Sequence, residues 1–169
     1  IRYLRKGCSY TLSDLKKHTA ALRQRLESLP YENYALCLDD TFEFTCALLA
    51  CLYAQKKPVL PGHRIKSLLR TEVLQKRSYD CLLIDEESSE LQDVPCLNVP
   101  TLESTVESPD SCFVKAPSSD SPIIMYTSGS TGESKRIVRP LYCMEREAVL
   151  LQEHFGTRLH AGLQVAGTV

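Results

Sequence analysis

The sequence lacks a surplus of either charge: 20 Lys and Arg residues stand against 21 Asp and Glu residues, for a formal net charge of −1. A chain this close to neutral has no strong overall field, so neither nucleic acid nor an anionic membrane surface is expected as its partner. It also lacks a long hydrophobic run. Its longest apolar stretch, Cys46–Ala54, is far shorter than the roughly 20 residues that cross a bilayer. We therefore expect no membrane span, and the polar, basic first residues do not resemble a signal peptide.

The eight cysteines lack the spacing of a metal site, because no pair has the CxxC pattern and the four histidines form no zinc-ligand pattern with them. Several cysteines lie inside apolar runs, where a free thiol behaves as a small hydrophobe. A disulfide framework is the alternative, but small disulfide scaffolds are rich in glycine and loops and short of core residues. The sequence thus favours buried free thiols and a reducing, cytoplasmic setting, and we assign no metal ligands.

Helical periodicity and short apolar runs alternate along the chain. Helices are expected over Leu12–Leu29, Thr41–Ala54, Ile65–Lys76 and Tyr142–Phe155, and strands over Tyr34–Leu38, Pro58–Pro61, Cys81–Ile84, Ile123–Tyr126 and Arg136–Arg139. Strands separated by helices of about a dozen residues form parallel βαβ units, so the sequence predicts an α/β fold. We divide the chain into a βαβ part, 1–99, an acidic Ser- and Pro-rich connection, 100–121, and a last part, 122–169.

The two ends of the chain suggest a piece of a longer protein. The sequence opens on Ile1 rather than on methionine, and it stops directly after an apolar segment, Leu163–Val169, that reads as a strand. A natural domain rarely finishes in a bare strand with nothing to cover its edge. We therefore expect 1–169 to be an incomplete portion of a domain.

The segment between the last two predicted strands has the composition of a phosphate-binding loop. Four hydroxyl residues and two glycines occupy six consecutive positions, and a lysine follows three residues later. Glycines let backbone N–H groups turn inward around an anion, hydroxyls add donors without bulk, and a lysine supplies a compact positive charge. The candidate ligand-binding residues are Thr127, Ser128, Gly129, Ser130, Thr131, Gly132 and Lys135.

Two other interpretations of this segment fit it less well. A flexible Ser/Gly surface loop is common, but such a tether would not need an apolar strand directly before it and another directly after it. The P-loop of NTPases, G-x-x-x-x-G-K-[ST], does not fit, because Gly129 and Gly132 are three positions apart and Lys135 follows Ser134 rather than glycine.

The run Tyr-Thr-Ser-Gly-Ser-Thr-Gly-Glu-Ser-Lys, from Tyr126 to Lys135, closely resembles the phosphate-binding signature of the adenylate-forming (AMP-binding) superfamily. That superfamily includes acyl- and aryl-CoA synthetases, luciferases and the adenylation domains of nonribosomal peptide synthetases. Thr41–Ala54 followed by Pro58–Pro61 is similar to the family's early buried helix and the strand after it, and Leu12–Leu29 is similar to its leading helix. The resemblance implies part of a large N-terminal α/β domain, with parallel βαβ units around a mixed sheet.

The sequence departs from the family pattern at three positions. Arg136 follows the loop lysine and Gln55 follows the early helix, where the family commonly has glycine, and Pro140 replaces a polar residue. These departures indicate a divergent branch. The final residues, Val165–Val169, resemble ligases encoded with bacterial aryl-polyene or xanthomonadin-type pigment pathways.

The resemblance implies an ATP-dependent acid–thiol ligase. Such an enzyme activates a carboxylic acid to an acyl-adenylate, releases pyrophosphate, and passes the acyl group to the thiol of CoA or of an acyl carrier protein. The loop residues would hold the ATP phosphates with Mg²⁺ sharing the charge, and none of them would be a catalytic nucleophile or base. The family's acyl and adenine pockets lie beyond Val169, so the isolated chain is expected to be inactive. A non-catalytic nucleotide- or partner-binding module with the same fold is the alternative.

Overall fold

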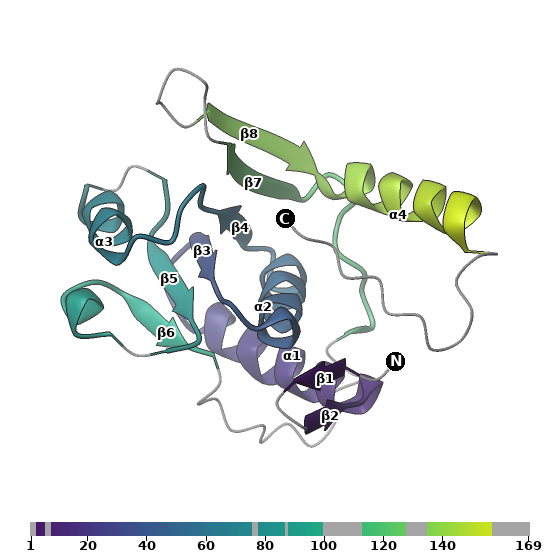
Figure 1. Ribbon diagram of the computed structural model, residues 1–169, viewed down its shortest axis with the longest axis horizontal. Coiled ribbons are helices and arrows are strands. Elements are labelled where there is room, and N and C mark those ends of the chain that lie inside the picture. The colour runs from purple at the N-terminus through teal and green to yellow at the C-terminus, as the bar shows by residue number, and fades with distance from the viewer. Residues whose placement is uncertain are drawn as a thin grey trace.

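The centre of the molecule is a six-stranded sheet (Figure 1), seen in a computed structural model that describes residues 3–5, 8–75, 78–86, 88–99, 113–127 and 135–156. Its strands, in spatial order, are β6 (Cys96–Asn98), β5 (Cys81–Ile84), β3 (Asn33–Cys37), β4 (Lys57–Leu60), β7 (Pro122–Thr127) and β8 (Lys135–Pro140). All neighbouring pairs are parallel except β7 and β8, which are antiparallel. The predicted α/β fold with parallel units around a mixed sheet is confirmed.

Helices cover both faces of this sheet. Helices α1 (Leu12–Glu27) and α2 (Thr41–Tyr53) lie side by side on one face, and α3 (Lys66–Leu74) packs on the other together with a short 3₁₀ turn, η1 (Ser89–Leu91). Side chains alternate along a strand, so Leu83 of β5 joins the core beneath α1 and α2 whereas its neighbour Leu82 joins the core beneath α3. Strands buried on both faces explain why the sequence shows continuous apolar runs.

The starts of the two largest buried helices follow from capping side chains. Thr11 forms a capping box with Asp14 at α1, and the Asp40 carboxylate accepts the N–H groups of Phe42 (2.8 Å) and Glu43 (3.1 Å) at α2. Both caps satisfy backbone donors that have no partner inside the helix. These two caps explain why α1 and α2 begin where they do.

The end of α2 requires an unusual backbone conformation. The N–H of Gln55 donates to the carbonyl of Leu52 (3.2 Å) and that of Lys56 donates to the carbonyl of Cys51 (2.8 Å), which is the bond pattern of a Schellman motif. The residue after the C-cap must then be left-handed, and Gln55 has a φ of 57°. Glycine is the residue that adopts this conformation without a steric penalty, so Gln55 carries a backbone strain that glycine would not.

The sequence missed the shortest elements. These are an N-terminal hairpin of β1 (Tyr3–Arg5) and β2 (Cys8–Tyr10), the turn η1, and the edge strand β6. Segments of three residues are too short to show a periodic pattern, and β6 is recognisable only through its pairing with β5. The expected strand over Leu163–Val169 and most of the connection 100–121 lie outside the described residues. In the described part of that connection, the ring of Phe113 packs edge-on against Tyr53 of α2, with ring centroids 4.8 Å apart.

Six cysteines of the described ranges are free thiols. Cys46, Cys51 and Cys81 are buried, and Cys37, Cys96 and Cys143 are partly buried. Burial raises the pKa of Cys46 and of Cys81 to about 12, so these thiols stay protonated and unreactive at neutral pH. For these six residues the prediction of free thiols is confirmed.

The last helix, α4 (Leu141–Phe155), makes little contact with the rest of the fold. It follows β8 and extends away from the sheet (Figure 1), and none of its residues is buried. Val149, Leu150 and Leu151 each expose more than half of their surface, and Phe155 exposes 44%. Isolated helices of this length are marginal in water. Among the described helices, none is long and apolar enough to cross a membrane.

Candidate phosphate-binding site

The candidate loop joins the last parallel strand to the antiparallel edge strand. Thr127 is the final residue of β7 and Lys135 the first of β8, and the two are paired in register, directly beside the pair Tyr126 and Arg136. Residues 128–134 therefore connect two strand ends that are held together by the hairpin ladder. Because β7 is parallel to β4, this connection leaves the sheet at the edge where the parallel strands have their carboxyl ends, which is where ligands bind in open α/β sheets.

The turn after β4 presses against the base of this loop. A Cβ on Gly62 would lie 3.1 Å from the carbonyl oxygen of Tyr126 and 3.3 Å from its Cβ, which is closer than side chains ordinarily approach a backbone. A larger residue at position 62 would have to push the end of β7 aside. Gly62 therefore allows the β4–α3 turn to support the strand end from which the loop begins.

Polar side chains that the sequence did not single out lie next to this turn. The Tyr126 hydroxyl donates to Ser78 Oγ (2.7 Å), and His63 Nε2 lies 3.4 Å from Glu72 Oε2, which also accepts the hydroxyl of Tyr79. The Nδ1 atom of His63 is buried, with no hydrogen-bond partner within the described ranges. These residues come from the β4–α3 turn, from α3, from the segment before β5 and from β7, so no local pattern in the sequence connects them.

Of the seven predicted site residues, the structure describes two and leaves five outside the described residues. The backbone of Thr127 and the exposed residue Lys135 stand on adjacent strand ends at the carboxyl edge. Ser128, Gly129, Ser130, Thr131 and Gly132 lie outside the described residues. Lys135 has no ion-pair partner among the residues that the structure describes, so its ammonium group is available to an anion at the mouth of the hairpin.

A second crevice at the same edge, between β3 and β5, is already filled by protein groups. The chain crosses over at this point, because β4 lies on one side of β3 and β5 on the other, and such switch points often bind ligands. Here the Asp85 carboxylate accepts the backbone N–H groups of Asp39 (2.5 Å) and Asp40 (3.2 Å), and Asp39 also pairs with Arg64. The remaining cavity is about 120 Å³, below the usual range for small-molecule sites. Asp40 also caps α2, so its carboxylate is engaged by the protein as well.

One carboxyl group near this crevice has a perturbed pKa. Glu43 of α2 exposes 7% of its surface, and its Oε2 atom has no hydrogen-bond partner in the described part of the chain. Desolvation raises the pKa of Glu43, and the neighbouring carboxylates of Asp40 and Asp85 raise it further. Within the described ranges, no group of three or more His, Cys, Asp or Glu side chains is arranged to hold a metal ion.

The arrangement of the sheet and its helices is the fold of the N-terminal domain of adenylate-forming enzymes. The o-succinylbenzoate CoA synthetase of Bacillus subtilis, solved with its acyl-adenylate intermediate, superposes with a TM-score of 0.68 at 23% identity, over 89% of this chain and 32% of that chain. The fatty acyl-adenylate ligase of L. pneumophila, solved with acyl adenylate and pyrophosphate, gives a TM-score of 0.64 at 18% identity, over 92% of this chain and 30% of that chain.

A third solved relative is the N-terminal subdomain of Klebsiella oxytoca NpsA, with a TM-score of 0.60 at 20% identity, over 83% of this chain and 38% of that chain. At these identities the likeness establishes the fold alone. The chain spans about a third of the length of the structures that it matches. No protein-family model and no curated protein sequence matches it.

Proposed function

We propose that this chain is the phosphate-binding portion of an ATP-dependent, adenylate-forming acid–thiol ligase. The observation that carries the proposal is the position of the Tyr126–Lys135 signature. It spans the hairpin between β7 and β8 at the carboxyl edge of a sheet with the adenylate-forming fold. A segment of hydroxyls and glycines between two paired strand ends suits a polyphosphate, since such residues offer many donors with little bulk.

The residues at the hairpin fit the phosphates of ATP. Lys135 is exposed at the strand end, and the loop hydroxyls and backbone N–H groups of 127–132 supply further donors. Bound ATP with Mg²⁺ would supply the activated phosphorus centre at which the acid is joined to AMP. The contribution of these residues is to grip the β- and γ-phosphates and to neutralise the charge that grows as pyrophosphate leaves. A structure of the Bacillus subtilis synthetase contains ATP and a magnesium ion.

The proposed ligase is larger than this chain. The matched structures are about three times longer than the matched segment, and α4 presents Val149, Leu150, Leu151 and Phe155 to solvent. Soluble proteins seldom leave a contiguous apolar helix face uncovered. We infer that further parts of the ligase cover α4 and complete the acid and adenine pockets. The 169-residue chain by itself is then expected to show no ATP–pyrophosphate exchange.

The decisive experiment substitutes Lys135→Ala in the complete protein. Removing one charge-assisted contact to the leaving phosphates should lower the rate of ATP–pyrophosphate exchange about 10²-fold. Lys17→Ala, at an exposed lysine of α1, is the matched control and should leave exchange unchanged. Unfolding midpoints measured for both variants separate a catalytic loss from a folding loss.

Either of two results would defeat this proposal. Exchange at the normal rate in the Lys135→Ala variant would show that the lysine does not grip phosphate. Full function in a cell-based assay without any pyrophosphate exchange would favour the non-catalytic nucleotide- or partner-binding module. Exchange by the isolated 169 residues would contradict the claim that the chain is inactive alone.

The partners follow from the proposed reaction. A carboxylic acid is the substrate, and CoA or an acyl carrier protein is the thiol acceptor. Free, buried thiols such as Cys51 and Cys81 support a reducing, cytoplasmic location. The narrower placement, in the branch of aryl-polyene or xanthomonadin-type pathways, rests on Val165–Val169, which lie outside the described residues, and it stays a prediction.

A further inference from the structure

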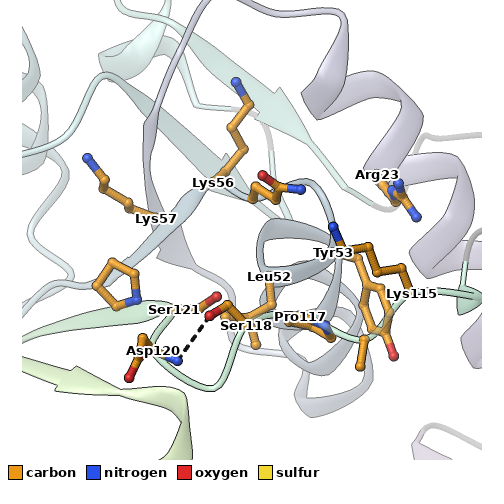
Figure 2. A pocket seen from close by; sticks show the side chains of 13 residues that line it. Arg23, Leu52, Tyr53, Lys56, Lys57, Lys115, Pro117, Ser118, Asp120 and Ser121 are labelled. Atoms are coloured by element: carbon orange, nitrogen blue, oxygen red, sulfur yellow. Dashed lines mark hydrogen bonds between the residues drawn. The ribbon is translucent and has the colours of Figure 1, made fainter.

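A second cavity lies at the opposite edge of the sheet, where β4 and β7 have their amino ends (Figure 2). Its volume is about 430 Å³, within the range of small-molecule sites. Its walls come from α1, from the end of α2, from the start of β4 and from the segment 115–122 that leads into β7. The candidate phosphate loop leaves the sheet at the other end of β7, so the two sites are separate.

Positive charge dominates the lining of this cavity. Four cations, Arg23, Lys56, Lys57 and Lys115, face a single carboxylate, that of Asp120. Figure 2 shows Lys56 and Lys57 on one side of the cavity and Arg23 and Lys115 on the other. Cations gathered from separate elements around one cavity raise the local concentration of anions.

Two of the four cations pair with acidic side chains that do not line the cavity. Lys56 pairs with Glu32 at 3.2 Å and Arg23 with Glu27 at 2.7 Å. Both acids are largely exposed, with 58% and 45% of their side-chain surface accessible, and such surface pairs are weak. In the described part of the chain, Lys57 and Lys115 have no ion-pair partner. The two lysines therefore remain available to an anion that enters between them.

The rest of the lining suits an organic group attached to that anion. Leu52, Tyr53 and Pro117 supply apolar surface, and the Tyr53 ring is held by its edge-on contact with Phe113. Ser118 and Ser121, which lie next to Asp120 in Figure 2, add hydroxyl groups to the lining.

The serine wall is formed before any ligand binds. Ser121 N–H donates to the Ser118 carbonyl (2.9 Å), Leu141 N–H donates to the Ser121 carbonyl (2.9 Å), and Asp120 N–H donates to Ser118 Oγ (3.3 Å). A wall held in this way loses little conformational entropy on binding.

The wall also contains the residue that follows the C-cap of α2. Gln55, with its φ of 57°, lines this cavity. The two hydrogen bonds that close α2 impose this conformation. Glycine at this position would remove both the strain and the amide side chain from the wall.

We propose that the cavity at the amino edge binds a phosphate monoester of a small organic molecule. The long, flexible side chains of Lys57 and Lys115 turn toward the phosphate dianion when it enters, the Ser118 and Ser121 hydroxyls add donors, and the organic group packs on Leu52 and Tyr53. Lysine suits this task because its three donors and compact charge meet phosphate oxygens from any direction. The site is distinct from the ATP-binding hairpin and does not depend on it.

The test measures binding of phenyl phosphate to the 169-residue chain by titration of backbone amide NMR shifts. The Lys135→Ala variant serves as the background, so that the hairpin contributes as little as possible. Saturable shifts are expected at Gln55, Ser118 and Ser121. The double variant Lys57→Ala/Lys115→Ala should bind at least tenfold more weakly, whereas Lys57→Arg/Lys115→Arg should retain binding.

The controls address charge and ligand parts separately. Lys17→Ala/Lys66→Ala removes the same total charge from positions outside the cavity and should leave the affinity within twofold. Phenol keeps only the aromatic ring of the probe and inorganic phosphate keeps only its phosphate group. Each should bind at least tenfold more weakly than phenyl phosphate. An equal loss of affinity in both double alanine variants, or shifts confined to the region around Thr127, would overturn the proposal.

Discussion

The sharpest stability prediction concerns Gln55, because its backbone conformation conflicts with its residue type. The left-handed φ of 57° is imposed by the two bonds that close α2, from Gln55 N–H to Leu52 and from Lys56 N–H to Cys51. For a residue with a Cβ this conformation costs roughly 1–2 kcal/mol. Glycine avoids that cost but loses more backbone entropy on folding, by roughly 0.4–1 kcal/mol. The substitution Gln55→Gly should therefore stabilise the chain by about 0.5–1 kcal/mol.

Urea unfolding followed by circular dichroism measures this change. With a slope of about 2 kcal/mol/M for a domain of this size, the midpoint should rise by about 0.25–0.5 M while the slope stays constant. A constant slope matters, because it shows that the substitution changed the folding free energy rather than the extent of the unfolded state. The melting temperature should rise by about 1–4 °C.

Gln55→Ala is the control, since alanine removes the same polar side chain but keeps the Cβ. Its effect should be small, because the left-handed strain remains. An unchanged or lowered midpoint for Gln55→Gly, or an equal gain for Gln55→Ala, would refute the explanation based on backbone strain. If Gln55 also serves the cavity at the amino edge, the glycine variant should be more stable and yet bind phenyl phosphate more weakly.

Two further predictions concern acidic residues. Glu43 has a raised pKa in the folded state, so its ionised form costs stability above the ordinary carboxyl pKa of about 4.5, and the cost grows as pH rises toward the folded value. Glu43→Gln should therefore raise the urea midpoint at pH 7 but not near pH 3.5, and an equal shift at both would exclude titration as the cause. Asp80 Oδ2 accepts the backbone N–H groups of Glu32 (3.1 Å) and Asn33 (2.9 Å), so Asp80→Ala should destabilise the fold by about 1–3 kcal/mol in the same assay. Asp93→Ala, which breaks an exposed pair with Arg70, should cost much less, and equal losses would contradict the role assigned to Asp80.

The sequence alone predicted the order of the longer helices and strands. The leucine spacing in α1, the all-round apolar character of α2 and the short run Cys81–Ile84 are local signals, and each appears in the structure where it was expected. The caps at Thr11 and Asp40 were equally readable, because a cap and the N–H groups that it accepts lie within three residues of one another. The signature from Tyr126 to Lys135 belongs to the same class, since a continuous loop carries its chemistry in adjacent residues.

Only the tertiary structure decided where these elements lie relative to one another. The placement of β3 between β5 and β4 depends on which faces the crossover helices cover, and no stretch of sequence records that choice. The contact of His63 with Glu72 and the approach of Gly62 to Tyr126 join distant parts of the chain. The same is true of the cavity that Lys57 and Lys115 both line. The candidate loop was thus identified by its own residues. Its position at the carboxyl edge, and the separate basic cavity at the amino edge, arise from packing between elements that no local pattern describes.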